Sequence, residues 1–166
     1  DDDSIDAELN GPDVLTVTHT AANEDIDRIP EDGPAVVVAN HPFGGIEGLV
    51  LAAMARTVRD DVRVVADGVL EGLTDAVGFL VDDPLDRGWA AMRSAVSCID
   101  WVEDGGLLVV FPARSRRRFR SRRRHARNPG WRSAVARIVR RAEAPVLPVY
   151  FAGAHQAVFD ILDLIR

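Results

Sequence analysis

A histidine and a glutamate share one short segment of the chain with residues that favour tight turns. The segment, residues 40–48, reads NHPFGGIEG. Pro42 stops a strand from continuing, and the glycine pair lets the backbone approach a ligand closely. If a helix begins near Ile46, Glu47 lies in its first turn and can bond one imidazole nitrogen of His41. The carboxylate would then stabilise the imidazolium while the other nitrogen takes a proton from a hydroxyl or an amine. His41 is thus a candidate general base, and Glu47 its orienting acid.

A purely structural role explains the same two residues equally well. The imidazole of His41 would cap a turn, and Glu47 would sit in solvent at a helix N-terminus, where the helix dipole favours acidic residues. On residue types alone, both interpretations stand.

Short β-branched apolar runs alternate along the chain with segments of helical spacing. Predicted strands cover residues 14–18, 35–39, 62–65, 106–111 and 145–151. Predicted helices cover residues 47–59, 86–102, 131–141 and 155–165. Strands such as 35–39 are apolar on both faces, which is typical of a largely parallel sheet with helices on both faces. We therefore predict an α/β fold in a single domain over residues 1–166.

Ligand sites in open α/β sheets lie at the carboxyl ends of strands. Two predicted strands are followed by unusual residues: the 40–48 segment comes after Ala39, and an arginine-rich run comes after Phe111-Pro112. Residues 114–127 hold nine of the chain's 20 basic residues and no acidic residue, although the net charge of the chain is -6. We expect the arginine run to face His41 across one site.

The arginine run allows several interpretations. Arginines beside a strand end can clamp a phosphate, or draw the protein onto anionic lipid at about 1 kcal/mol per basic residue. A basic block can also be a solvated loop or a nucleic-acid patch, but single-strand binders usually interleave aromatic residues and this run has only Phe119. In a GC-rich gene, a shifted reading frame over residues 114–126 would produce the same run. We do not expect nucleic acid to be the partner.

Other functional classes lack their motifs in this sequence. The four histidines are far apart and the single cysteine, Cys98, gives no ligand spacing, so we expect no metal site. No serine lies in a Gly-x-Ser-x-Gly motif, and the glycines match neither a P-loop nor a dinucleotide fingerprint. We expect Cys98 and the tryptophans to be packing residues. No apolar stretch approaches the ~18 to 20 residues of a transmembrane helix.

The 40–48 segment, following a Val-Val-Val-Ala strand, resembles the first motif of the glycerolipid acyltransferase superfamily. The five residues between histidine and acid are similar to the spacing in its hemolysin-like branch, which includes ornithine-lipid and lysophospholipid acyltransferases. The resemblance covers most of the chain, through residues 62–66, 78–82, 106–112 and 144–150.

This resemblance implies transfer of a fatty acyl group from a coenzyme A or acyl carrier protein thioester to a lipid acceptor. The acceptor would be a lysophospholipid, glycerol phosphate or lyso-ornithine lipid, reached by peripheral association with the inner face of the cell membrane, without metal or cofactor. Catalysis would fall to His41 and Glu47. Arg87 would contact substrate, although it can equally start a helix or pair with Asp83. The full set of expected substrate-binding residues is Asn40, Gly44, Gly45, Arg87, Phe111, Pro112 and Arg114.

Three departures from the family pattern keep an alternative function open. Glu47 stands where the family usually has aspartate, and a displacement of the carboxylate by about 1 Å can cost about a hundredfold in rate. After Phe111-Pro112 the family has a glycine near an acidic residue, but this chain continues ARSRRRFR. Relatives also continue past the last matched helix, so C-terminal truncation is expected. The alternative is a catalytically inactive homologue that binds lipid or anions.

Overall fold

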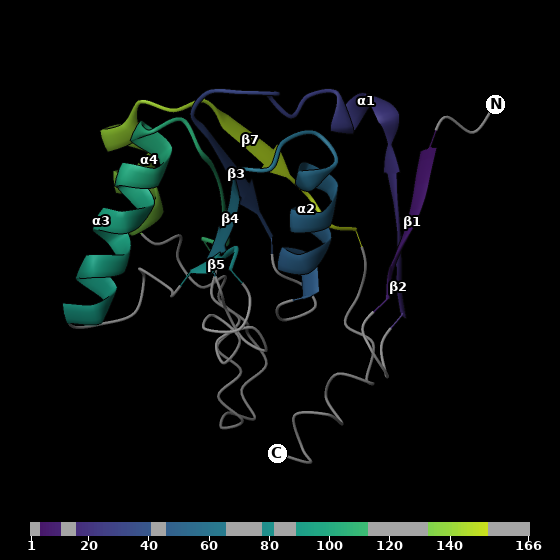
Figure 1. The fold of residues 1–166 in the computed structure, drawn as a ribbon, viewed down its shortest axis with the longest axis horizontal. Helices are drawn as coiled ribbons and strands as arrows, with labels where there is room; N and C mark the ends of the chain where they lie inside the picture. The colour runs from purple at the N-terminus through teal and green to yellow at the C-terminus, as the bar shows by residue number, and fades with distance from the viewer. Residues whose placement is uncertain are drawn as a thin grey trace, which may run out of the picture.

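The computed structural model describes residues 4–10, 16–40, 46–65, 78–81, 89–112 and 133–152. Within these ranges the chain forms a five-stranded sheet flanked by helices, and a separate two-stranded sheet near the N-terminus (Figure 1).

The five-stranded sheet is parallel in every pairing. Its order is β5 (Leu80–Val81), β4 (Val62–Val65), β6 (Leu107–Val110), β3 (Ala35–Ala39) and β7 (Val146–Val149). All five residues of β3 are buried, and its run of valines suits a strand covered on both faces. The four strands predicted for this sheet are confirmed, with their ends moved by up to two residues, and β5 is an edge strand that the sequence did not predict.

Three helices connect strands of this sheet: α2 (Ile46–Arg56) lies between β3 and β4, α3 (Trp89–Glu103) between β5 and β6, and α4 (Ser133–Ala142) between β6 and β7. The helices predicted over 47–59, 86–102 and 131–141 are thus confirmed with shifted ends. The fourth predicted helix, 155–165, lies outside the described residues.

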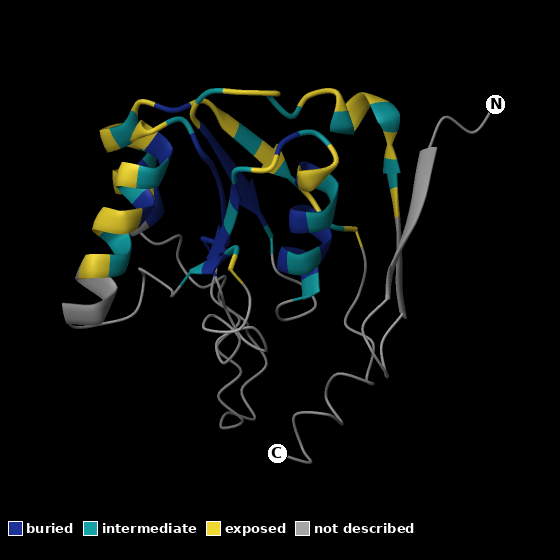
Figure 2. Cartoon of the chain, in the orientation of Figure 1, coloured by how far each residue is buried: buried dark blue, intermediate teal, exposed yellow. Residues whose placement is uncertain are grey.

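The helices cover both faces of the sheet, as Figure 2 shows for its buried strands. Alternate residues of β3 point to opposite faces, as in any strand. Val37 belongs to a core cluster with Leu51 of α2, whereas Val36 belongs to a second cluster with Val102 of α3 and Ile138 of α4. Cys98 is buried in this second cluster, as predicted. The predicted α/β architecture is confirmed at this level.

The N-terminal strands form a sheet of their own. β1 (Ser4–Asn10) pairs antiparallel with β2 (Thr16–Ala22), and the short helix α1 (Asn23–Ile26) follows. The strand predicted at 14–18 overlaps β2, but it belongs to this antiparallel pair and not to the parallel sheet. β1 and β2 are joined by a short connection, which permits only antiparallel pairing, because a parallel pair needs a crossover of about a dozen residues.

Arg59 ties together the loops at the amino ends of three strands. Its guanidinium bonds to Asp61, just before β4, with Nε donating to Oδ1 at 2.6 Å. Nη1 donates to the carbonyl of Gly33, before β3, and Nη2 to that of Gly105, before β6, at 2.8 and 2.6 Å. Both glycines have positive φ, 77° and 98°, a conformation that favours glycine. The Arg59 side chain, only 3% exposed, therefore holds the edge of the sheet opposite the predicted site.

The turn from α3 into β6 is closely packed against Trp101. The indole Nε1 donates a hydrogen bond to the carbonyl of Leu107 at 3.1 Å, and the guanidinium of Arg63 lies 3.9 Å over the ring. A Cβ on Gly106 would overlap Nε1 and lie 2.8 Å from Cδ1 of the indole. Trp101 is a packing residue, as the sequence predicted, and it requires glycine at position 106.

β7 is the last strand of the described sheet on its side. The amide of Val36 bonds to the carbonyl of Pro145 at 3.0 Å, so the odd-numbered residues of β7 face the β3 ladder. The backbone groups of Val146 and Pro148 consequently point to the outer edge. Along the same strand, Leu147 and Val149 pack toward α2, while Val146 is 44% exposed.

Candidate functional site

The neighbouring strands β3 and β6 send the chain to opposite faces of the sheet. β3 leads to α2 on one face, and β6 leads to α4 on the other. The two strands are paired in register up to Val38 and Val110, so Asn40 and Phe111 follow at the same edge. Such a switch of direction between adjacent parallel strands is where α/β proteins usually bind ligands. The structure thus brings together the two strand ends that the sequence singled out.

Glu47 is buried at the start of α2. It is the second residue of the helix and is 1% exposed. The structural alternative in which Glu47 sits in solvent was therefore wrong, although the predicted helix start near Ile46 is confirmed. A carboxylate buried to this degree is costly unless polar or charged groups meet it.

The side-chain amide of Asn40 forms two hydrogen bonds with the backbone of Phe151. Nδ2 donates to the Phe151 carbonyl at 3.0 Å, and Oδ1 accepts from the Phe151 amide at 2.7 Å. These bonds join the end of β3 to the chain just beyond β7. A role for Asn40 in binding substrate stays a prediction, but its amide already has this protein partner.

Phe111 and Pro112 are buried where β6 ends. Phe111 is 4% exposed and belongs to the core cluster on the α2 face, and Pro112 is among the fully buried side chains. Both were predicted as substrate contacts, and the structure places them beneath the surface. They therefore lie in the core, at the carboxyl end of β6.

The remaining predicted site residues lie outside the described residues. These are His41, Gly44, Gly45, Arg87 and Arg114. The pairing of His41 with Glu47 and the role of the arginine run therefore stay predictions.

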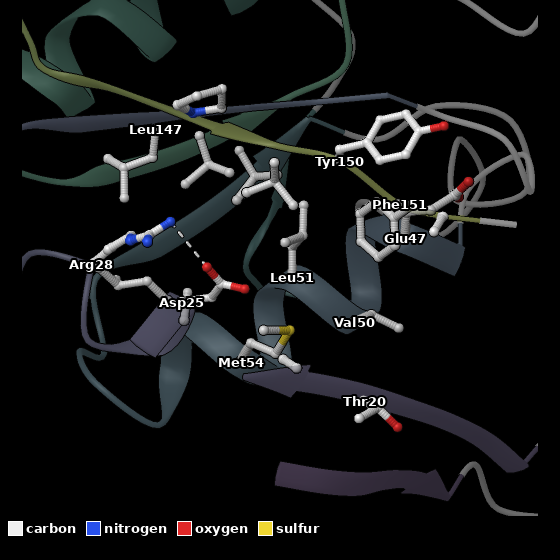
Figure 3. A pocket seen from close by; sticks show the side chains of 18 of the residues that line it. Thr20, Asp25, Arg28, Glu47, Val50, Leu51, Met54, Leu147, Tyr150 and Phe151 are labelled. Carbon is white, nitrogen blue, oxygen red and sulfur yellow. Dashed lines mark hydrogen bonds and ion pairs between the residues drawn. The ribbon is translucent and has the colours of Figure 1, made fainter. Parts of the chain in front are cut away.

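A cavity of about 890 Å³ opens beside Glu47 on the α2 face of the sheet. Its walls come from α2, the central strands, β7 and the β2–α1 segment, and most of the lining is aliphatic or aromatic, as with Leu51 and Phe151 (Figure 3). Glu47 and Phe151 lie at one end. The ion pair of Asp25 and Arg28, 3.1 Å apart, lies at the other end.

Sequence reasoning missed this cavity because its walls come from separate stretches of the chain. A partial signal was present in β7, where Leu147, Val149 and Phe151 alternate with more exposed residues and so line one face. Nothing in the sequence indicated that the β2–α1 segment would form the outer wall.

Neither a metal cluster nor a membrane-spanning helix occurs in the described part of the chain. No group of three or more His, Cys, Asp or Glu side chains there is placed to hold a metal ion. No helix there is long and apolar enough to cross a bilayer. No family model, curated protein or solved structure matches the chain.

Proposed function

We propose that this chain is an acyltransferase domain of the glycerolipid acyltransferase type. It moves a fatty acyl group from a coenzyme A or acyl carrier protein thioester to a hydroxyl or amine of a lipid acceptor. It acts while bound peripherally to the cytoplasmic face of the membrane. The observation that carries the proposal is the burial of Glu47 in the first turn of α2, the helix that follows β3, where Glu47 lines an apolar cavity.

The cavity suits the hydrocarbon tail of an acyl group. Ligand pockets of about 300–1,000 Å³ with apolar walls and few polar groups are typical of small-molecule sites, and this one holds about 890 Å³. Residues along α2 line it, from Glu47 at one end to Met54 near the Asp25–Arg28 pair. A tail lying along it would bring the thioester carbonyl to the Glu47 end.

The chemistry would then fall to His41, which follows Asn40 directly in the sequence. A carboxylate as buried as Glu47 needs polar partners, and we propose the imidazole of His41 as one of them. The other imidazole nitrogen takes the acceptor's proton as its oxygen or nitrogen attacks the thioester carbonyl. The new ester or amide bond forms, the carbon–sulfur bond breaks, and the leaving thiolate takes the proton from the imidazolium.

Turnover assays with matched variants test this function. The purified chain is given acyl-coenzyme A or acyl carrier protein thioesters with lysophospholipid, glycerol phosphate or lyso-ornithine lipid. We expect His41→Ala and Glu47→Gln each to lower kcat about a hundredfold or more. Binding of a fluorescent fatty acid should be unchanged in His41→Ala, which separates binding from catalysis. Equal turnover by wild type and His41→Ala would exclude His41 as the base.

A second candidate is a catalytically inactive homologue that binds lipid. The cavity favours it, because an apolar pocket binds a hydrocarbon tail whether or not His41 reacts. Fatty acid binding by the wild type, without turnover of any donor and acceptor pair, would decide for this second function. Glu47→Asp, which supplies the acid usual in the family, should then fail to create activity.

A further inference from the structure

We propose that Asn40, the residue before His41 in the sequence, is a positioning residue that holds the end of β3 to Phe151 in the wall of the apolar cavity. This inference rests on the proposed function for its catalytic meaning. The contacts that carry it are independent of any activity.

The side chain of Asn40 takes the place of backbone hydrogen bonding between β3 and β7 where β3 ends. The last backbone partners of the two strands are Ala39 and Val149. Asn40 is the next residue after Ala39, and its side chain offers both a donor and an acceptor to the backbone of Phe151, two residues beyond Val149, at 3.0 and 2.7 Å. The chain just beyond β7 thereby stays attached to the end of β3. A neutral amide can satisfy a peptide N–H and C=O in this way through two separate atoms, and an aliphatic side chain of similar size cannot.

Phe151 connects its hydrogen bonds with Asn40 to the wall of the cavity. Its backbone is held by Asn40, and its side chain packs against the core cluster that includes Leu51 and lines the cavity at the end where Glu47 lies (Figure 3). A hydrocarbon tail in the cavity contacts the same wall. Filling the cavity therefore restrains Phe151. Through the hydrogen bonds of Phe151 it also restrains Asn40, the residue before His41.

Backbone amide exchange of Phe151 is the direct test, because its N–H donates to Asn40 Oδ1. We expect Asn40→Ala to speed exchange at Phe151 about tenfold, and Asn40→Asp, which keeps an acceptor oxygen, to preserve most of the protection. The amides of Val37 and Val109 in the central strands serve as internal controls and should stay unchanged. Unchanged exchange at Phe151 in Asn40→Ala would overturn the proposal. So would an equal increase at Val37 and Val109, which would mark a general loss of stability.

Dodecanoate, a single-chain amphiphile, tests the link to the cavity. It should slow Phe151 exchange in the wild type and have a weaker effect in Asn40→Ala. An equal effect in both proteins would show that the cavity and Asn40 are not coupled, and would overturn that part of the proposal.

Kinetics separate a positioning residue from a substrate ligand. A positioning role predicts that Asn40→Ala lowers kcat about ten- to a hundredfold with little change in KM, whereas loss of a substrate contact raises KM. Absence of turnover in every variant would defeat the proposed function and leave the exchange result standing. Active wild-type protein with unaltered Phe151 exchange in Asn40→Ala would defeat the positioning role alone.

Discussion

Arg59 and Asp61 form a bidentate ion pair just before β4. Nε of the guanidinium donates to one carboxylate oxygen at 2.6 Å and Nη2 donates to the other. The same guanidinium also reaches the carbonyls of Pro30, Gly33 and Gly105. One side chain thus satisfies acceptors from the loops before three parallel strands.

Removal of this guanidinium should be among the more destabilising single changes on the molecule. Arg59→Ala leaves these carbonyls without the donor that now serves them, and we expect the free energy of unfolding to fall by about 3 kcal/mol. Arg59→Lys keeps the charge but lacks the planar fork, so it should recover only part of the loss. Urea denaturation measures both variants. A loss below about 0.5 kcal/mol in Arg59→Ala would contradict the assigned role.

The pH dependence of stability should carry a contribution from Asp61. The hydrogen bond from Arg59, aided by its charge and opposed by partial burial, lowers the pKa of Asp61 below its ordinary value of 3.8. The unfolded chain then binds a proton at a higher pH than the folded chain does. The stabilisation is complete above 3.8 and is lost as the pH falls through the lowered folded value. The stability difference between wild type and Asp61→Asn should therefore be constant near neutral pH and shrink in acid. A difference that grows in acid would contradict the pairing.

Gly106 should tolerate no side chain, in contrast to Gly78. Gly106→Ala places a methyl group into the indole of Trp101, which is held by Leu107 and Arg63, and we expect a loss of about 2 kcal/mol. Gly78→Ala is the matched control, because a Cβ there meets nothing within 4 Å. Thermal unfolding compares the two variants. Equal midpoints would mean that the Trp101 ring moves aside at little cost.

The cavity should lose its longer ligands when its far end is filled. Met54 lies on α2 toward the Asp25–Arg28 end, and Met54→Trp should weaken palmitate binding about tenfold, a change of about 1.4 kcal/mol, while sparing octanoate. Val96→Trp adds an indole at an exposed site on α3, on the opposite face of the sheet, and should leave binding unchanged. Displacement of a fluorescent fatty acid gives both affinities. Equal losses for the two fatty acids would show that neither tail lies along α2.

The parts of the fold that the sequence predicted are those governed by local patterns. A valine run with no polar interruption predicts a strand buried on both faces, and β3 matches its prediction to the residue. The turn residues before Ile46 likewise located the start of α2. β2 was misassigned because its apolar run does not reveal its partner, and β1 has too few β-branched residues to stand out.

In the candidate site too, local patterns were predicted and long-range contacts were not. The pattern of the 40–48 segment identified Glu47, but its burial depends on how α2 packs against the sheet. The bond from Asn40 to Phe151 joins residues 111 positions apart, and no local pattern encodes it. Arg59 shows the same limit, because its acceptors Gly33 and Gly105 are brought together only by the finished sheet.

The outward-facing position of Pro148 on β7 has a consequence for self-association. An unpaired strand edge is a template for aggregation, because its free N–H and C=O groups can recruit a strand from another molecule. Pro148 has no N–H to offer at the centre of that edge, so an incoming strand would leave one of its carbonyls unbonded. Among the described residues no strand pairs with this edge of β7, and there the proline disfavours edge-to-edge pairing while its neighbours Leu147 and Val149 face the cavity.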